Sequence, residues 1–201
     1  MCGAFSFVLK APTNKRQRAA CSPGRPFVFE REVHMKKVAI IMGSKSDWQI
    51  AQKAVDVLSS YGIPHTVMVA SAHRTPELVR DFALSARENG FGAIIALAGM
   101  AAHLAGAIAA NTTLPVVGVP VKSGDLGGLD ALLSTVQMPP GIPVATVAVN
   151  GAANAAHLCA QMLGITDETL KNKLAKQRET MEREAIMANE ALQNERSGEA
   201  T

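Results

Sequence analysis

Short apolar runs alternate with stretches of helical periodicity along the chain from residue 37 onward. The apolar runs have the length and the aliphatic content of buried strands and cover residues 38–42, 66–70, 93–98, 116–119 and 144–149. A segment with helical spacing follows each run, at about 47–61, 76–89, 101–111, 129–136 and 154–163. Apolar strands that alternate with helices are typical of a parallel sheet covered on both faces. Five such units predict a flavodoxin-like, doubly wound α/β fold of three layers, with one domain over residues 35–165.

Glycine and proline mark the ends of two predicted helices. Gly62 ends the first helix and Pro64 prevents its continuation, because glycine tolerates a left-handed helix end and proline lacks an N–H. Pro76 fits the first position of the next helix, where a missing N–H costs nothing, and Thr75 is a suitable cap before it. Gly90 is the expected stop of that helix.

The pattern changes after Gly164, where a long charged helix is predicted over residues 167–193. Its apolar residues recur at steps of three, four or seven and are Leu170, Leu174, Met181, Ala185, Ala188 and Leu192. An apolar stripe on a terminal helix usually docks on another surface. We expect residues 166–201 to be an oligomerisation helix and tail that docks on a neighbouring subunit, which predicts a homo-oligomer. The alternative is that the helix packs on its own sheet.

Composition bounds the class of protein. The chain has 201 residues, of which 48% are hydrophobic, enough for one well-filled core. No apolar run approaches the roughly 20 residues of a membrane span, so we expect a soluble protein without a membrane partner. The three cysteines, Cys2, Cys21 and Cys159, have no metal-ligand spacing and form a poor disulfide framework. A reducing compartment follows, and we expect a cytoplasmic protein.

The net charge of +3 is concentrated at one end of the chain. Residues 1–34 hold six basic against two acidic residues, a net +4, which leaves −1 for the rest. A nearly neutral domain lacks the basic face of a nucleic-acid-binding protein. We interpret residues 1–34 as an N-terminal extension. It is either an organelle transit peptide or an upstream segment ahead of a start at Met35, and the sequence leaves both open.

The most suggestive chemistry lies at the end of the second predicted strand. His73 and Arg74 stand side by side there, directly before the helix that begins at Pro76. The carboxyl ends of parallel strands are where open α/β sheets bind ligands. A base beside a fixed cation, both next to a helix N-terminus, suits a small anionic substrate.

The loop after the first strand offers a second set of polar groups. Gly43, Ser44 and Ser46 present backbone N–H groups and hydroxyls to which a phosphate can bind, and Asp47 can accept hydrogen bonds from ribose hydroxyls. Alternatively, Ser46 or Asp47 simply caps the helix. No Gly-x-Gly-x-x-Gly follows the strand, so a dinucleotide cofactor has little support.

His73 is the best general base that the chain offers, because an imidazole gives and takes a proton near neutral pH. A lone histidine is more often structural, yet the strand-end position and Arg74 favour catalysis. His103 follows the third strand and either lines the same crevice or caps its helix. His65 and His157 are expected to be structural, and the histidines lack metal-ligand spacing on one helix, so no metal is expected.

Five blocks of sequence together resemble one family. They are residues 43–48 (GSKSDW), 71–76 (SAHRTP), 101–104 (AAHL), 118–121 (GVPV) and 136–139 (VQMP). In this order, between residues 36 and 163, they resemble the 5-(carboxyamino)imidazole ribonucleotide mutases, the PurE family of purine biosynthesis.

The resemblance implies a flavodoxin-like core, a homo-octamer and isomerisation of the carboxyamino ribonucleotide to the 4-carboxy ribonucleotide without a cofactor. By position, it makes His73 the general acid and base. Ser44, Asp47 and Arg74 become substrate contacts. The neighbouring positions that it adds to the substrate site are Gly43, Ser46, Ser71, Ala72, Gly99, Ala101, Ala102 and His103.

Two positions depart from the family pattern. Met100 stands where the family has a second glycine before AAHL, and Ala105 stands where it has proline. The branch that carboxylates aminoimidazole ribonucleotide directly has His-Lys in place of His73-Arg74, so this chain favours the mutase. The alternatives are that direct carboxylase and a noncatalytic nucleotide- or sugar-phosphate-binding module, because a fold does not fix a function.

Overall fold

A computed structural model describes residues 35–198 of the chain. The predicted extension, residues 1–34, lies outside the described residues. Five parallel strands form one sheet in the order β2-β1-β3-β4-β5. Their bounds are β1 Lys37–Met42, β2 His65–Val69, β3 Phe91–Gly99, β4 Val116–Val121 and β5 Ala145–Thr146. This is the flavodoxin-like order, and the predicted fold class is confirmed.

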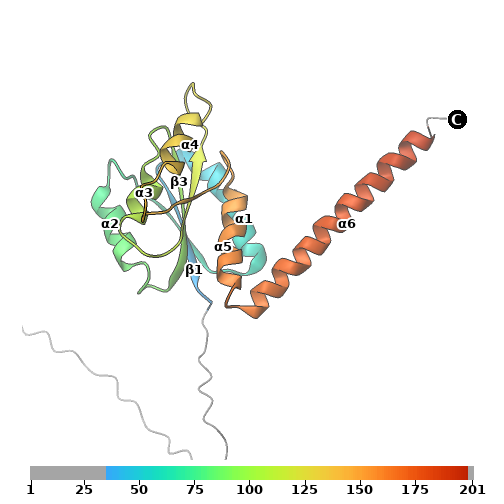
Figure 1. The fold of residues 1–201 in the computed structure, drawn as a ribbon, viewed down its shortest axis with the longest axis horizontal. Helices are drawn as coiled ribbons and strands as arrows, with labels where there is room; N and C mark the ends of the chain where they lie inside the picture. The colour runs from blue at the N-terminus through green and yellow to red at the C-terminus, as the bar shows by residue number, and fades with distance from the viewer. Residues whose placement is uncertain (1–34, 199–201) are drawn as a thin grey trace, which may run out of the picture. The chain divides into compact units, whose positions relative to one another are not determined.

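Helices cover both faces of the sheet (Figure 1). One face carries α1 (Trp48–Tyr61) and α5 (Ala152–Gly164), which pack against each other. The other face carries α2 (Pro76–Ser85), α3 (Leu104–Ala109) and α4 (Leu129–Val136). A short 3-10 turn, η1 (Lys45–Asp47), precedes α1. None of the described helices is both long and apolar enough to cross a membrane.

Successive side chains of each buried strand point to opposite faces of the sheet and so contribute to two separate apolar cores. In β1, Val38 and Ile40 belong to the core under α1 and α5, whereas Ala39 and Ile41 belong to the core under α2 and α3. All four side chains are at most 1% exposed. Because both faces are buried, the strand reads as a continuous apolar run. Burial of each larger aliphatic side chain stabilises the fold by roughly 1.5–3 kcal/mol.

Several boundaries differ from the predicted ones. α2 ends at Ser85, four residues before the predicted end, and the chain reaches Gly90 (φ 81°) through hydrogen-bonded turns. α3 begins at Leu104 because residues 100–103 form a loop. β5 has only two residues. Gly62 ends α1 in the left-handed conformation (φ 73°), as predicted.

Thr75 occupies the N-cap position of α2, as predicted, but its hydroxyl does not perform the capping. Thr75 makes no capping hydrogen bond with its hydroxyl. The hydroxyl points back to Ser71 instead, accepting its N–H at 2.9 Å and donating to its carbonyl oxygen at 3.1 Å. The Thr75 hydroxyl therefore closes the turn that carries His73 and Arg74, and it makes no hydrogen bond to an N–H group of α2.

Replacing Thr75 by Val should open this turn. The isosteric valine removes both side-chain hydrogen bonds, and we expect a loss of about 1 kcal/mol in the free energy of unfolding, since exposed groups regain hydrogen bonds to water. Urea unfolding measures the loss, with Thr75→Ser as the control that keeps the hydroxyl. Equal stability of the valine and serine variants would contradict the turn-closing role.

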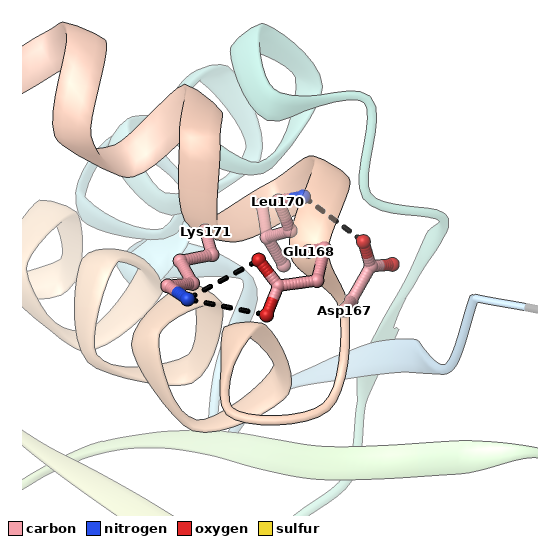
Figure 2. A network of polar contacts seen from close by, with 4 residues as sticks. All are labelled: Asp167, Glu168, Leu170 and Lys171. Atoms are coloured by element: carbon pink, nitrogen blue, oxygen red, sulfur yellow. Dashed lines mark hydrogen bonds and ion pairs between the residues drawn. The ribbon is translucent and has the colours of Figure 1, made fainter.

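α6 (Glu168–Gly198) begins with a defined cap, shown in Figure 2. The Asp167 carboxylate accepts the backbone N–H of Leu170 at 2.9 Å. Lys171 forms an exposed ion pair with Glu168 at 3.1 Å. The Asp167 carboxylate satisfies a free N–H group of the first turn, and the negative charge of Glu168 interacts favourably with the N-terminal end of the helix dipole. Both favour a helix start here.

Only the first part of α6 packs on the described domain. Leu170 is fully buried, Leu174 is half-buried, and the Lys173 ammonium donates to the Tyr61 carbonyl oxygen at 2.6 Å. Residues 181–197 are exposed throughout, including Met181 and Leu192 of the predicted apolar stripe. The stripe is thus covered by α1 and α5 near its start and uncovered after residue 180.

Candidate active site

A cavity of about 500 Å³ lies at the carboxyl ends of β1, β2 and β3. The loops after these strands form its walls, and Ser123 joins them from the loop after β4. The lining residues are Gly43, Ser44, Ser46, Asp47, Ser71, Ala72, His73, Arg74, Ala98, Gly99, Met100, Ala101, His103, Leu104 and Ser123. Its volume falls in the range of small-molecule sites.

Ser44 and Ser46 organise the loop after β1. The Ser44 hydroxyl caps η1 by accepting the Ser46 N–H at 3.3 Å, and it also accepts the Ser46 hydroxyl at 2.8 Å. Asp47, at the start of α1, makes no capping bond with its side chain. Side-chain capping, which we considered for Ser46 or Asp47, is performed by Ser44 at η1, and Asp47 occupies the N-cap position of α1 without using its carboxylate for it.

Asp47 is a buried carboxylate at the cavity, only 7% exposed. Burial raises its pKa, and the hydrogen bond that it accepts from the Ser46 hydroxyl opposes that shift. No ion pair to Asp47 occurs within residues 35–198, and a buried carboxylate without a cation beside it costs folding free energy, which is typical of a group kept to bind a ligand.

Replacing Asp47 by Asn should stabilise the fold at neutral pH. Because the pKa of Asp47 is higher in the folded than in the unfolded chain, folding loses stability as pH rises from the ordinary value of 3.8 through the raised one. At pH 7 the amide avoids this cost, so Asp47→Asn should melt at a higher temperature, and the gain should shrink as pH falls toward 3.8. Asp125→Asn, at an exposed carboxylate, is the control. A lower melting temperature at pH 7 would contradict the argument.

Arg74 connects the loops after β1 and β2. Its guanidinium donates from Nη2 to the Gly43 carbonyl oxygen at 2.8 Å, and its backbone N–H donates to the Ser71 hydroxyl at 3.3 Å. No carboxylate within residues 35–198 pairs with Arg74. Nη2 of the guanidinium is thus fixed to the protein, and the other N–H groups of Arg74 can donate hydrogen bonds to an anion in the cavity.

His73 and His103 face each other across the cavity. Nε2 of His73 and Nδ1 of His103 are 2.8 Å apart in a hydrogen bond, and the two rings are nearly perpendicular at 79°. Both side chains are exposed to the cavity. His103 occupies the N-cap position of α3 but makes no capping bond with its side chain, which lines the crevice instead. The pair holds both rings in one orientation.

The other histidines have local partners. The His65 ring lies 3.0 Å from the Ile63 carbonyl oxygen, and His157 bonds to the Tyr61 hydroxyl at 3.1 Å. Cys159 is buried, and burial raises the pKa of its thiol to about 12, so it is no nucleophile. Within the described ranges no cluster of three His, Cys, Asp or Glu side chains could hold a metal ion.

The cavity brings together every predicted site residue except Ala102. Ala102 is 2% exposed and is not among the lining residues. Sequence reasoning missed Ser123, although its position just after β4 is the same signal that located His73. It also missed Ala98 and Leu104, whose apolar character gave no indication of a site.

A larger cavity, of about 910 Å³, lies elsewhere in the domain and includes Pro115 and Val116 at the start of β4. Its charged side chains are Arg87 and Glu88, and Arg87 is bound to the Thr113 hydroxyl at 2.8 Å. No histidine lines it. It therefore lacks the pairing of an imidazole with a fixed arginine that the smaller cavity has, and the smaller cavity is the candidate active site.

Comparisons with known proteins identify the family and agree with the fold. The family model described as AIR carboxylase matches residues 37–184. The N5-carboxyaminoimidazole ribonucleotide mutase of Saccharolobus solfataricus is 51% identical over 152 residues, which are 76% of this chain and 96% of that protein. The protein of the same name from Bacillus subtilis is 50% identical over 157 residues, 77% of this chain and 97% of that protein.

A solved structure has the same fold. The crystal structure of Treponema denticola PurE superposes with a TM-score of 0.70 at 27% sequence identity and covers 77% of this chain and 97% of that one. The matched region contains the whole sheet and all loops of the candidate site. On this evidence, the chain belongs to the AIR carboxylase family.

Proposed function

We propose that this protein is an N5-carboxyaminoimidazole ribonucleotide mutase. It converts 5-carboxyamino-1-(5-phosphoribosyl)imidazole into 5-amino-1-(5-phosphoribosyl)imidazole-4-carboxylate, an isomerisation in purine biosynthesis. The observation that carries the proposal is the meeting of His73, Arg74 and Asp47 in one cavity at the ligand-binding edge of the sheet. The names and the roughly 50% identity of the relatives support it.

The polar groups of the cavity match the parts of a ribonucleotide. The hydroxyls of Ser44 and Ser46 and the adjoining N–H groups bind the phosphate, and Asp47 accepts hydrogen bonds from the ribose hydroxyls. Arg74, fixed to the Gly43 carbonyl oxygen, directs its free donors at an anionic group of the substrate. A rigid cation orients the reacting group without moving during the reaction.

His73 carries the proton in both halves of the reaction. As the protonated imidazole, it donates to the carbamate nitrogen while the N–C bond breaks and carbon dioxide leaves. The amino group makes carbon 4 of the ring electron-rich, so carbon 4 attacks carbon dioxide and forms the new C–C bond. His73, now neutral, removes the proton from carbon 4 and regains its starting state. The steps balance without ATP or a metal.

His103 is a positioning residue in this scheme. Its 2.8 Å hydrogen bond to Nε2 fixes the His73 ring and leaves Nδ1 of His73 for the substrate. A fixed ring reaches both the nitrogen and carbon 4 with little movement, which favours proton transfer in the bound state.

Turnover with the carboxyamino ribonucleotide tests the proposal. Purified protein should form the 4-carboxy ribonucleotide without ATP, and faster than it forms this product from aminoimidazole ribonucleotide and bicarbonate. A faster reaction from the second pair would identify the direct carboxylase. Tight binding of the ribonucleotide without product from either source would identify a noncatalytic binding module.

The proposal includes a homo-octamer assembled through α6. Met181 and Leu192 are 53% and 52% exposed, and a neighbouring subunit supplies the apolar surface that this chain does not. Light scattering should give eight times the chain mass for the wild type and a smaller mass for Met181→Glu combined with Leu192→Glu. Asn194→Glu, also an exposed site on α6, is the control. An octamer that survives the double replacement would contradict assembly through this stripe.

We further propose a cytoplasmic location. The buried free thiol of Cys159 suits a reducing compartment. Residues 1–34 fused to a fluorescent protein should leave it in the cytoplasm, and import into an organelle would identify them as a transit peptide instead.

A further inference from the structure

Two residues other than glycine have a positive φ within residues 35–198, Met100 (54°) and Asn150 (59°). Asparagine visits this region readily, and Asn150 also has local hydrogen bonds. Its side-chain oxygen accepts the Lys122 N–H at 2.9 Å, and its own N–H donates to the Pro120 carbonyl oxygen at 2.8 Å. Met100 has a flexible apolar side chain that gives its backbone no such support.

The structure holds Met100 in this conformation from the neighbouring loop. The Met100 N–H donates to the Ser123 hydroxyl at 3.1 Å. Ser123 can approach the main chain of Met100 because the residue before Met100 is Gly99. A Cβ added at Gly99 would collide with the Ser123 hydroxyl. Ser123 therefore has a positioning role, and it fixes the main chain of Met100 at the cavity.

Glycine would adopt this backbone without strain, as six described glycines with positive φ do. What methionine adds at position 100 is a side chain. That side chain lines the cavity and is nevertheless 64% exposed, so it lies at the opening. Backbone strain at a binding site indicates that the strained residue contributes there.

An open mouth gives carbon dioxide a route out of the site during the proposed reaction. Carbon dioxide carries no charge, so Arg74 and His73 hold it only weakly after the N–C bond breaks. It either adds to carbon 4 or escapes, and escape leaves aminoimidazole ribonucleotide behind. The nearby walls, formed by Ala72, Ala98 and Ala101, are apolar and small. A long apolar side chain over the opening slows escape and excludes water.

We propose that the Met100 side chain closes the mouth of the site over the reacting carboxyl group and retains carbon dioxide until carbon 4 captures it. This inference rests on the proposed function. Met100 is then a residue that determines the fate of the intermediate, whereas His73 performs the proton transfers.

Retention of label tests this role. The substrate is labelled with carbon-13 in its carbamate carboxyl group, and the reaction runs in unlabelled bicarbonate. We expect Met100→Ala to release aminoimidazole ribonucleotide in about 3- to 10-fold more turnovers than the wild type, with the label lost to solvent. Met100→Leu, which keeps a long apolar side chain, should retain the carbon-13 label in the product as the wild type does. Leu126→Ala, at an exposed apolar residue of the loop after β4 that does not line the cavity, should retain label as the wild type does.

Met100→Gly separates containment from stability. Glycine relieves the backbone, so this variant should melt no lower than the wild type and yet lose label as Met100→Ala does. If both variants retain label like the wild type while the wild type turns over, the role of Met100 is wrong and the proposed function stands. If the wild type itself forms no 4-carboxy product, the proposed function fails and this inference fails with it.

Discussion

Replacing His73 by Asn is expected to lower kcat by about 10²- to 10⁴-fold, the usual contribution of general acid–base catalysis. Asparagine keeps the approximate size of imidazole and can hydrogen-bond to His103, but it cannot carry a proton. Because Ser44, Asp47 and Arg74 remain, the dissociation constant of the ribonucleotide should change only a few-fold. Steady-state turnover and calorimetric binding measure the two quantities separately.

His103→Asn is the matched control for this prediction. His103 also lines the cavity and shares the 2.8 Å hydrogen bond, but it is expected only to orient His73. Its replacement should therefore reduce kcat by much less than that of His73. Near-normal turnover of His73→Asn, or a larger loss with His103→Asn, would contradict the assignment of the proton-transfer role.

Replacing Arg74 by Ala is expected to weaken ribonucleotide binding by about 10- to 100-fold, which corresponds to the roughly 1.5–3 kcal/mol of a charge-assisted hydrogen bond. The change also removes the bond to the Gly43 carbonyl oxygen that joins the two loops. Arg74→Lys keeps the charge but not the planar donor pair, so its affinity should lie between those of the wild type and Arg74→Ala. Isothermal titration with the ribonucleotide measures the loss.

Arg80→Ala provides the comparison, since Arg80 is exposed on α2 and does not line the cavity. Arg80→Ala removes the same charge from a position six residues further along the chain and should leave the affinity unchanged. Equal losses for Arg74→Ala and Arg80→Ala would mean that net charge, and not a fixed contact, attracts the substrate.

The fold could be predicted because each buried strand is a short apolar run followed by a helix. Strand β1 is apolar on both faces, and this pattern has few structural solutions besides a covered parallel sheet. Local ends were harder to predict. Gly62 marked the end of α1 correctly, whereas α2 ended before Gly90 because a helix end depends on the turns that follow it.

The position of the candidate site could be predicted where one loop carried its own chemistry, as with His73 and Arg74, which line the cavity. The pairing of His73 with His103, 30 residues apart, depends on β1 lying between β2 and β3 in the sheet. Ala102 is buried and does not line the cavity, unlike its neighbours Ala101 and His103, because adjacent residues of a loop can face opposite sides. Ser123 acts through the backbone of Met100, a contact that no sequence motif specifies.

Carbon-13 NMR of the labelled carboxyl group tests the central claim most directly, namely that the His73 imidazole moves the protons of an isomerase at this edge of the sheet. With the wild type, the signal of the nitrogen-bound carbamate should be replaced by that of a carboxylate on carbon 4. With His73→Asn at the same concentration and saturating substrate, the replacement should be slower by at least about 10²-fold. Equal conversion by the two proteins, or no conversion by the wild type, would contradict the account.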